Sequence, residues 1–295
     1  ALSKFAPELK YVGLCHSVQG TAEDLAKDIG EDIKNINYEC SGINHMSFYQ
    51  KITKISTGED LYPRLKKFGF DVINDKKVSS RTNRIEDSGK HLHEKVRYEI
   101  LNRFGYFVTE SSEHFAEYVP WFIKSGRNDL IDKYKIPIDE YIDRCNFYEN
   151  LWINLEKDIS QIADQEIKRS NEYASFIMDG FTNNNPIIIY ANVMNNGLIE
   201  NLPTNCCVEV PCKIDGSGFV PQKIGKLPEH LSALMRTNIN VQILTAEAAL
   251  TKKREHIYHA ALLDPLTSSN LSIDEIYSMV DELIEAHGNY LPKYI

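Results

Sequence analysis

The chain has 295 residues, of which 42% are hydrophobic and 25% charged, a composition typical of a globular protein with one large or two small cores. Its formal net charge of −9 argues against a basic surface that neutralises phosphates, so we expect no nucleic-acid partner. No run of about eighteen apolar residues is present, so we expect no membrane span.

The cysteines show neither a disulfide framework nor a zinc motif. They stand at positions 15, 40, 145, 206, 207 and 212, and no CxxC or HExxH spacing occurs. A chain of this size needs no covalent staples, so a reducing, cytoplasmic location is expected. The sequence opens without an initiator methionine or a signal-peptide pattern, which we interpret as a cut or processed end.

The pattern predicts mixed α and β structure with no internal domain boundary. In chain order we expect a strand over 9–14, a helix over 20–29, a strand ending at Asn44-His45, a strand over 46–56, a long mobile loop over 71–89, a helix over 91–104, a polar segment over 109–118, a long helix over 147–168, a buried strand over 186–193, a hairpin formed by 206–214 and 218–224, and closing helices over 229–250, 254–262 and 273–287.

The most informative residues are a thiol and an imidazole, each placed at the end of a predicted strand. Cys15 follows the strand over 9–14, His45 follows the second strand, and polar residues come next in both cases. Two such ligands could hold one divalent metal ion. The alternative is a buried free cysteine beside a core histidine, since cysteine is among the most often buried residues.

A nucleotide-binding loop is not indicated by the residues alone. No GxGxxG follows the first predicted strand, and Gly216 and Gly218 are turn residues of the predicted hairpin.

Several segments resemble glycoside hydrolase family four, and within it the α-galactosidases that cleave melibiose. They are GLCHSVQGTAEDLA (13–26), GINHMSFY (42–49), VRYEIL (96–101), GYFVTESSEHFAEYVPWF (105–122), GLIENLP (197–203), CCVEVPC (206–212) and HLSALMRTNINVQ (230–242). The resemblance extends from residue 10 to the C-terminus.

The resemblance implies an α+β fold of the lactate/malate dehydrogenase-like, family-four C-terminal type, with a mixed antiparallel sheet packed with long helices. It also implies NAD and a divalent metal ion, usually Mn²⁺, as cofactors. The resemblance implies that the sugar is oxidised at C3 by hydride transfer to NAD and then loses its C2 proton, so that the glycosidic oxygen is eliminated. Water would then add to the unsaturated intermediate and the hydride would return from NADH to C3. Such NAD-dependent enzymes depart from the two-carboxylate rule of glycosidases. We therefore expect residues 1–295 to form a single C-terminal catalytic domain, with the NAD-binding Rossmann half missing from this chain.

The resemblance also assigns roles at the metal centre. Cys15 and His45 match the two metal ligands, with Cys15 bound as thiolate. His16, the residue after the metal cysteine, would be the general acid, and its alternative is a residue that only caps or packs the helix. Asn44 would contact substrate hydroxyls, although it could equally only support the neighbouring His45.

The base that removes the C2 proton is expected at Tyr98, with Arg97 assisting it. The alternative is that Tyr98 packs on its helix and Arg97 pairs at the surface. A competing site is the polar segment, where Glu113 and His114 could reach substrate, unless that segment is only a solvated loop.

The preferred substrate is expected to be an unphosphorylated α-galactoside such as melibiose. A phosphorylated sugar needs a cationic pocket, and the nearest candidates, Arg81 and Arg84, could be solvated charges. We also expect a homo-oligomer. Two alternatives remain: a non-catalytic oligomerisation or binding module, and a relative of the 2-hydroxyacid dehydrogenases.

Overall fold

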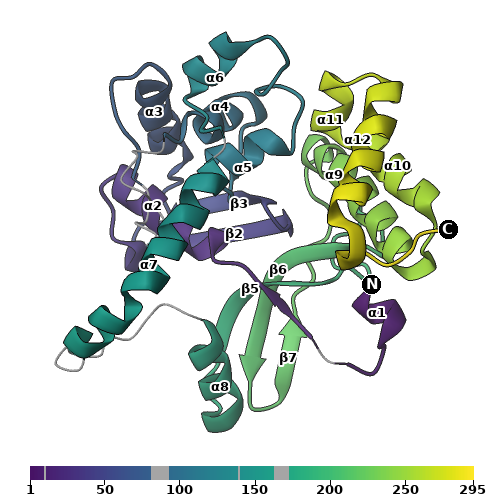
Figure 1. Cartoon of the computed structure of the whole chain (residues 1–295). Helices are drawn as coiled ribbons and strands as arrows, with labels where there is room; N and C mark the ends of the chain where they lie inside the picture. The colour runs from purple at the N-terminus through teal and green to yellow at the C-terminus, as the bar shows by residue number, and fades with distance from the viewer. Residues whose placement is uncertain (10, 81–92, 139, 163–172) are drawn as a thin grey trace.

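The computed structural model describes residues 1–9, 11–80, 93–138, 140–162 and 173–295. These residues form a seven-stranded sheet with helices packed against both faces (Figure 1). The strand order is β1-β5-β6-β2-β3-β4, β7 pairs with β6, and the pairs between these strands are all antiparallel. This confirms the expected α+β class with an antiparallel sheet.

The strands are β1 (Gly13–Leu14), β2 (Ile36–Ile43), β3 (Met46–Lys54), β4 (Phe107–Val108), β5 (Ile187–Met194), β6 (Cys207–Asp215) and β7 (Gly218–Pro221). The helices are α1 (Leu2–Phe5), α2 (Ser17–Asp28), α3 (Tyr62–Ile73), α4 (Lys95–Phe104), α5 (Ser112–Glu117), α6 (Asn128–Tyr134), α7 (Glu140–Ile162), α8 (Tyr173–Asn183), α9 (Glu229–Thr251), α10 (Arg254–Leu263), α11 (Pro265–Asn270) and α12 (Ile273–His287), with short 3-10 turns at Ile33–Asn35 and Gly288–Tyr290.

Two hydrophobic cores lie on opposite faces of the sheet, because side chains alternate along each strand. Phe48 of β3 joins the core that includes α5 and α9, whereas its neighbour Tyr49 joins the core formed with α2, α3 and α4. Along β6, Val208 and Val210 belong to the first core. Glu209, between them, therefore points to the other face.

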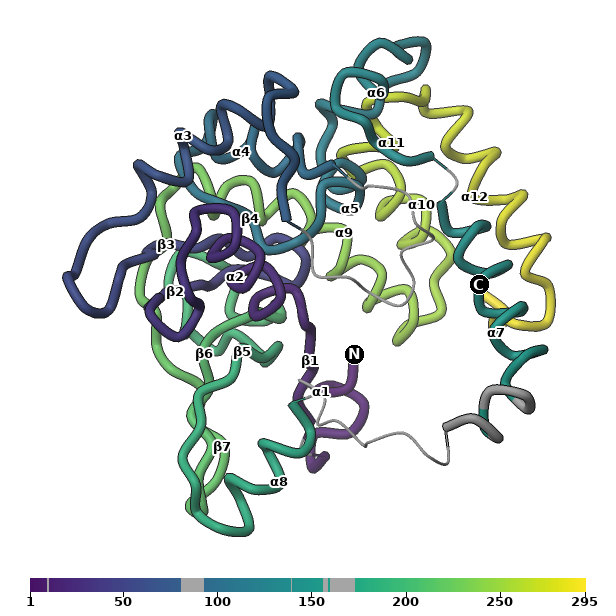
Figure 2. The backbone as a smooth tube through the Cα atoms, turned by 90° about the vertical axis from the view of Figure 1, so that its left-hand side faces the viewer, coloured from purple at the N-terminus to yellow at the C-terminus, as the bar shows by residue number. Residues whose placement is uncertain are grey.

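The remaining helices lie toward the two ends of the molecule. Helix α8 lies beside the β5–β6–β7 part of the sheet in both views (Figures 1 and 2). Helix α9 contributes to the first core, and helices α10 to α12 pack beside it next to the C-terminus. In the part of the chain that the structure describes, no helix is both long and apolar enough to cross a membrane.

Several sequence predictions need correction. The segment 71–89 begins inside α3, whose residues up to Ile73 are helical, and 81–92 lie outside the described residues together with Arg81 and Arg84. The predicted start of the first helix at residue 20 is late, since α2 begins at Ser17. The polar segment 109–118 contains helix α5 and is largely buried, because its charged groups find partners inside the fold.

Candidate metal centre

Cys15 stands where the chain leaves the sheet and enters a helix. Gly13 of β1 is paired with β5, and α2 begins at Ser17 with His16 as its N-cap. The Cys15 Sγ atom lies 3.2 Å from the Ser17 hydroxyl. Burial opposes ionisation of the thiol, but hydrogen bonds with His45 and Ser17 outweigh it and lower the pKa of Cys15 to about 7. A large share of this thiol is therefore thiolate at neutral pH.

His45 occupies the turn that joins β2 to β3. Ile43 and Met46, which flank the turn, are paired with each other. His45 has a φ of 63°, a left-handed conformation that is uncommon for residues other than glycine. Its Nδ1 lies 3.2 Å from the Tyr118 hydroxyl. A hydrogen bond with Cys15 raises the pKa of His45, and the negative charge of Glu110 adds to this effect. The turn thus presents the imidazole with one nitrogen already held by Tyr118.

Glu110 completes the cluster, and our sequence reasoning did not select it. It follows β4 by two residues and is 2% exposed. Its Oε2 lies 3.2 Å from His45 Nε2, and its Oε1 accepts the Ser111 N–H at 2.9 Å. The signal that could have found it is the one that found Cys15: a ligand-type side chain directly after a short strand.

The three side chains fit a divalent metal ion. One ligand atom from each of Cys15, His45 and Glu110 lies within 4.8 Å of the others, which suits ligands that share an ion at about 2.0–2.3 Å. Sulfur, imidazole and carboxylate together form a mixed donor set that suits borderline divalent ions. The Tyr118 contact would fix the imidazole, as partners of the second nitrogen do in metal sites.

Arg97 is buried behind this centre and holds the segment that carries Glu110. It is 4% exposed, and its Nη2 donates to the Thr21 hydroxyl and to the carbonyls of Val108 and Thr109. Its Nη1 lies 3.5 Å from the Glu94 carboxylate. Arg97 is therefore not a surface residue, and the contacts described here tie α4 to α2 and to the end of β4.

Tyr98 lies in the core between α3, α4 and the sheet and is not part of the cluster. It is 1% exposed, its ring packs on Phe107, and its hydroxyl donates to Asp28 at 2.5 Å. Burial raises the pKa of Tyr98 well above its usual value. In this position the phenol is shielded from a substrate and holds its proton tightly, so its predicted role as a base lacks geometric support.

Glu113 and His114 lie on α5, at different distances from the cluster. The His114 ring stacks on His45, with centroids 5.9 Å apart, and a hydrogen bond with Glu117 raises its pKa. Glu113 is buried and lies 3.8 Å from Arg144 of α7. The structure thus brings His114 next to the metal centre and joins Glu113 to α7.

His16 and Asn44 flank the cluster on the chain. His16 is exposed, and its ring stacks on Tyr173 of α8 at a centroid distance of 5.9 Å. Asn44 is half-buried in the turn beside His45. Both residues are therefore adjacent to a ligand and open to solvent, as groups that meet a substrate must be.

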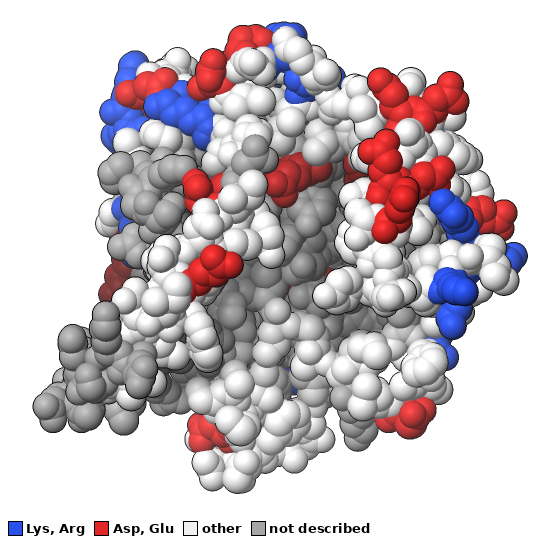
Figure 3. Space-filling model, in the orientation of Figure 1, with Lys and Arg blue, Asp and Glu red and all other residues white. Residues whose placement is uncertain are grey.

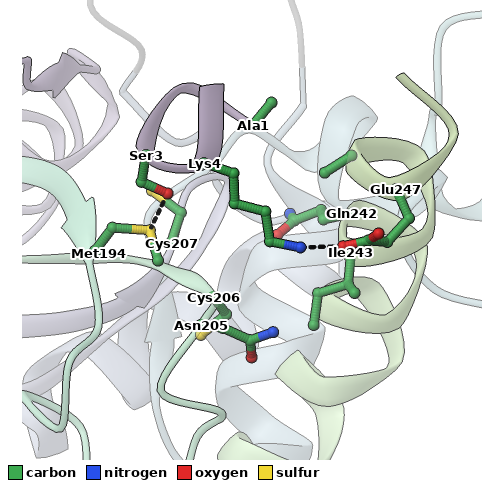
Figure 4. A pocket seen from close by; sticks show the side chains of 11 residues that line it. Ala1, Ser3, Lys4, Met194, Asn205, Cys206, Cys207, Gln242, Ile243 and Glu247 are labelled. Carbon is green, nitrogen blue, oxygen red and sulfur yellow. Dashed lines mark hydrogen bonds and ion pairs between the residues drawn. The ribbon is translucent and has the colours of Figure 1, made fainter. Parts of the chain in front are cut away.

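A second pocket lies elsewhere, between α1, the start of β6 and α9 (Figure 4). Lys4 forms an ion pair with Glu247 across it, and the exposed Cys207 lines one wall. Its lining, as far as the structure describes it, includes none of the predicted site residues. On the face shown in Figure 3, acidic side chains gather over α12.

The described residues offer no cradle for a dinucleotide. Such a cradle needs a glycine-rich turn between a parallel strand and a helix, and the strands of this sheet pair in antiparallel fashion throughout the described ranges.

The sequence is similar to a known family of glycosidases. Residues 40–267 match the model of the family 4 glycosyl hydrolase C-terminal domain. An α-galactosidase of Bacillus subtilis (strain 168) is 44% identical over 286 residues, which are 97% of this chain and 62% of the relative. An α-galactosidase of Rhizobium meliloti (strain 1021) is 32% identical over 96% of this chain and 56% of the relative. The chain thus spans less than two thirds of the length of either relative.

Solved structures show the same fold. The structure of lplD from Bacillus subtilis has a TM-score of 0.83 at 23% identity, covering 96% of this chain and 64% of that one. A 6-phospho-α-glucosidase from gut microorganisms, in complex with NAD and Mn²⁺, has a TM-score of 0.77 at 15% identity, covering 100% of this chain and 65% of that one. The matched domain and the two α-galactosidases establish that this chain belongs to glycosyl hydrolase family 4 and corresponds to its C-terminal portion.

Proposed function

We propose that this chain is the metal- and substrate-binding part of an NAD- and Mn²⁺-dependent α-galactosidase that cleaves melibiose-like α-galactosides. The observation that carries the proposal is the Cys15–His45–Glu110 cluster, in a chain 44% identical to an α-galactosidase. The named curated relatives are both glycosidases, so they give no support to a dehydrogenase of 2-hydroxy acids or to a non-catalytic module.

In this proposal Cys15, His45 and Glu110 hold the cation. When bound, a divalent ion polarises oxygen atoms of the sugar and favours loss of a proton from the neighbouring carbon. The lowered pKa of Cys15 supports binding as thiolate without a strong base. His16, exposed at the N-terminus of α2, donates a proton to the departing glycosidic oxygen, and Asn44 contacts sugar hydroxyls.

The proposal places NAD on a nucleotide-binding domain that is not part of this chain. A similar solved structure contains NAD together with Mn²⁺, and the described residues lack a dinucleotide cradle. Tyr98 is left out of the catalytic machinery here, because its hydroxyl is buried on Asp28.

The test is hydrolysis of nitrophenyl α-galactoside with and without NAD, Mn²⁺ and a reductant. The protein is assayed alone and joined to the N-terminal part of the Bacillus subtilis α-galactosidase. We expect turnover that requires all three additions and is lost in Cys15→Ser. Turnover that persists in Cys15→Ser, or cleavage of only the 6-phosphorylated substrate, would contradict the proposal.

A further inference from the structure

Glu209 lies in a row of paired residues that crosses the sheet beside the metal centre. Gly13 of β1 is paired with Asn192 of β5, and Asn192 is paired with Glu209 of β6. Directly paired residues point to the same face of a sheet. The Glu209 carboxyl group is therefore two strands away from Gly13, which precedes Cys15 by two residues.

The strands on either side of the His45 turn hold this carboxyl group from the other side. Gly42 of β2 pairs with Glu209 and also with Ser47 of β3. The Ser47 hydroxyl donates to Glu209 Oε2 at 2.6 Å. Because Ser47 follows His45 by two residues, the carboxyl group is held between the segments that carry two of the three ligands.

The carboxyl group of Glu209 is only half satisfied. The residue is 0% exposed, and Oε1 has no hydrogen-bond partner in the described part of the chain. Burial raises the pKa of Glu209 to about 7, and the charges of Cys15, His45 and Glu110 also act on it. Within the described ranges, no lysine or arginine forms an ion pair with this carboxyl group. A buried carboxylate with neither a full set of donors nor a cation costs free energy.

We infer that Glu209 is a positioning residue for the metal centre: its buried carboxylate supplies negative charge behind Cys15, His45 and Glu110 and so raises the affinity of the centre for a divalent cation. The inference rests on the proposed function, because the metal centre is part of it. Charges interact strongly away from water, and partners behind the ligands of a metal typically change its affinity about 10- to 100-fold.

The test is binding of Mn²⁺ alone, without NAD or substrate, measured by calorimetry and by the electron-spin resonance signal of free Mn²⁺. We compare wild type with Glu209→Gln, which keeps the shape and removes the charge. The matched control is Glu39→Gln, an exposed carboxylate on β2 that lies 3.3 Å from Lys51. We expect Mn²⁺ affinity to fall at least about tenfold in Glu209→Gln and to stay unchanged in Glu39→Gln.

The unfolding temperature separates this role from a purely structural one. Without metal, Glu209→Gln should unfold at the same or a higher temperature than wild type, because an uncompensated buried charge is removed. With Mn²⁺, its gain in unfolding temperature should be smaller than that of wild type, since stabilisation follows affinity. A structural residue would instead lower the unfolding temperature of the metal-free protein.

The possible outcomes separate the two proposals. If wild type binds Mn²⁺ and Glu209→Gln binds it with the same affinity, this inference is overturned and the proposed function stays intact. Wild type that does not bind Mn²⁺ overturns both. If Glu209→Gln does not fold, Ser47→Ala tests the same point, because it releases the carboxylate from the hydroxyl that orients it; unchanged Mn²⁺ affinity in folded Ser47→Ala overturns the inference.

Discussion

The Nε2 atom of His45 lies 3.2 Å from the Oε2 atom of Glu110, although the two residues are 65 positions apart. Their meeting follows from strand register. Phe48 of β3 is paired with Val108 of β4, so the turn before β3 and the segment after β4 reach the same edge of the sheet. The register of two short strands therefore brings two of the three candidate metal ligands together.

Replacing Glu110 with Gln should weaken Mn²⁺ binding at least about tenfold, because an amide is a poorer ligand than a carboxylate and lacks its charge. Binding of Mn²⁺ alone is the measurement. The control is Glu117→Gln on the neighbouring helix, where the carboxylate pairs with His114. Equal affinity in Glu110→Gln and wild type would remove Glu110 from the site.

Alkylation of Cys15 by iodoacetamide should become faster as pH rises, with its midpoint near pH 7. The pKa of this thiol is lowered to about 7, so the reactive thiolate is the minor form below that pH and the major form above it. Peptide mass spectrometry follows the residue, and Cys145, a free thiol that is more exposed than Cys15, is the internal reference. Mn²⁺ should protect Cys15 and leave Cys145 reactive; the reverse pattern would contradict the ligand assignment.

Replacing His16 with Ala should lower turnover of melibiose about 100-fold or more, the size of a general-acid contribution. Turnover of nitrophenyl α-galactoside should fall much less, since nitrophenolate leaves without a proton. Both rates are measured with NAD, Mn²⁺ and a reductant, in whichever form of the protein, alone or joined to the N-terminal part of the relative, turns over substrate. Equal losses with both substrates would argue that His16 serves the structure through its stacking on Tyr173.

Replacing Tyr98 with Phe should affect stability more than catalysis. The change removes the hydrogen bond to Asp28 and should lower the free energy of unfolding by about 1 kcal/mol, measured by urea denaturation. The kcat for nitrophenyl α-galactoside should stay within a few-fold of wild type. A loss of several orders of magnitude in a folded Tyr98→Phe would restore this residue as the base.

Replacing Arg97 with Met should destabilise the protein by about 3 kcal/mol, the cost of breaking a buried charge network. The guanidinium contacts Thr21, Val108 and Thr109, so the end of β4 should loosen as well. Arg103→Met is the control on the same helix: its side chain is exposed and pairs with Glu99, so a change of about 0.5 kcal/mol is expected. Equal effects would show that the buried contacts contribute little.

Much of the sheet could be predicted from the sequence. The apolar run in β5 and the turn residues between β6 and β7 are strong local signals, and both elements appear close to the predicted bounds. The pairing of Cys15 with His45 was also predicted, because each residue ends a strand. The local sequence pattern predicts a strand or a turn correctly where the residues of that element alone determine its structure.

The remaining features depend on contacts that a single sequence does not display. Glu110 is buried beside Cys15 and His45. Arg97 is buried because the Thr21 hydroxyl, 76 positions away, and two backbone carbonyls accept from its guanidinium. Tyr98 was expected as the base beside Arg97, but Asp28 gives its hydroxyl a partner inside the core. Polar composition suggested solvent at 109–118, whereas internal partners of these groups made burial possible.

The candidate ligands Cys15, His45 and Glu110 come from three chain segments, which precede α2, join β2 to β3 and follow β4. A cation bound to all three would link segments 30 and 65 positions apart and, because it binds only the folded form, would stabilise that form against unfolding. Depletion of the ion would then lower the free energy of unfolding and make the chain easier for proteases to cleave. The supply of metal would therefore affect the stability of the protein as well as its proposed activity.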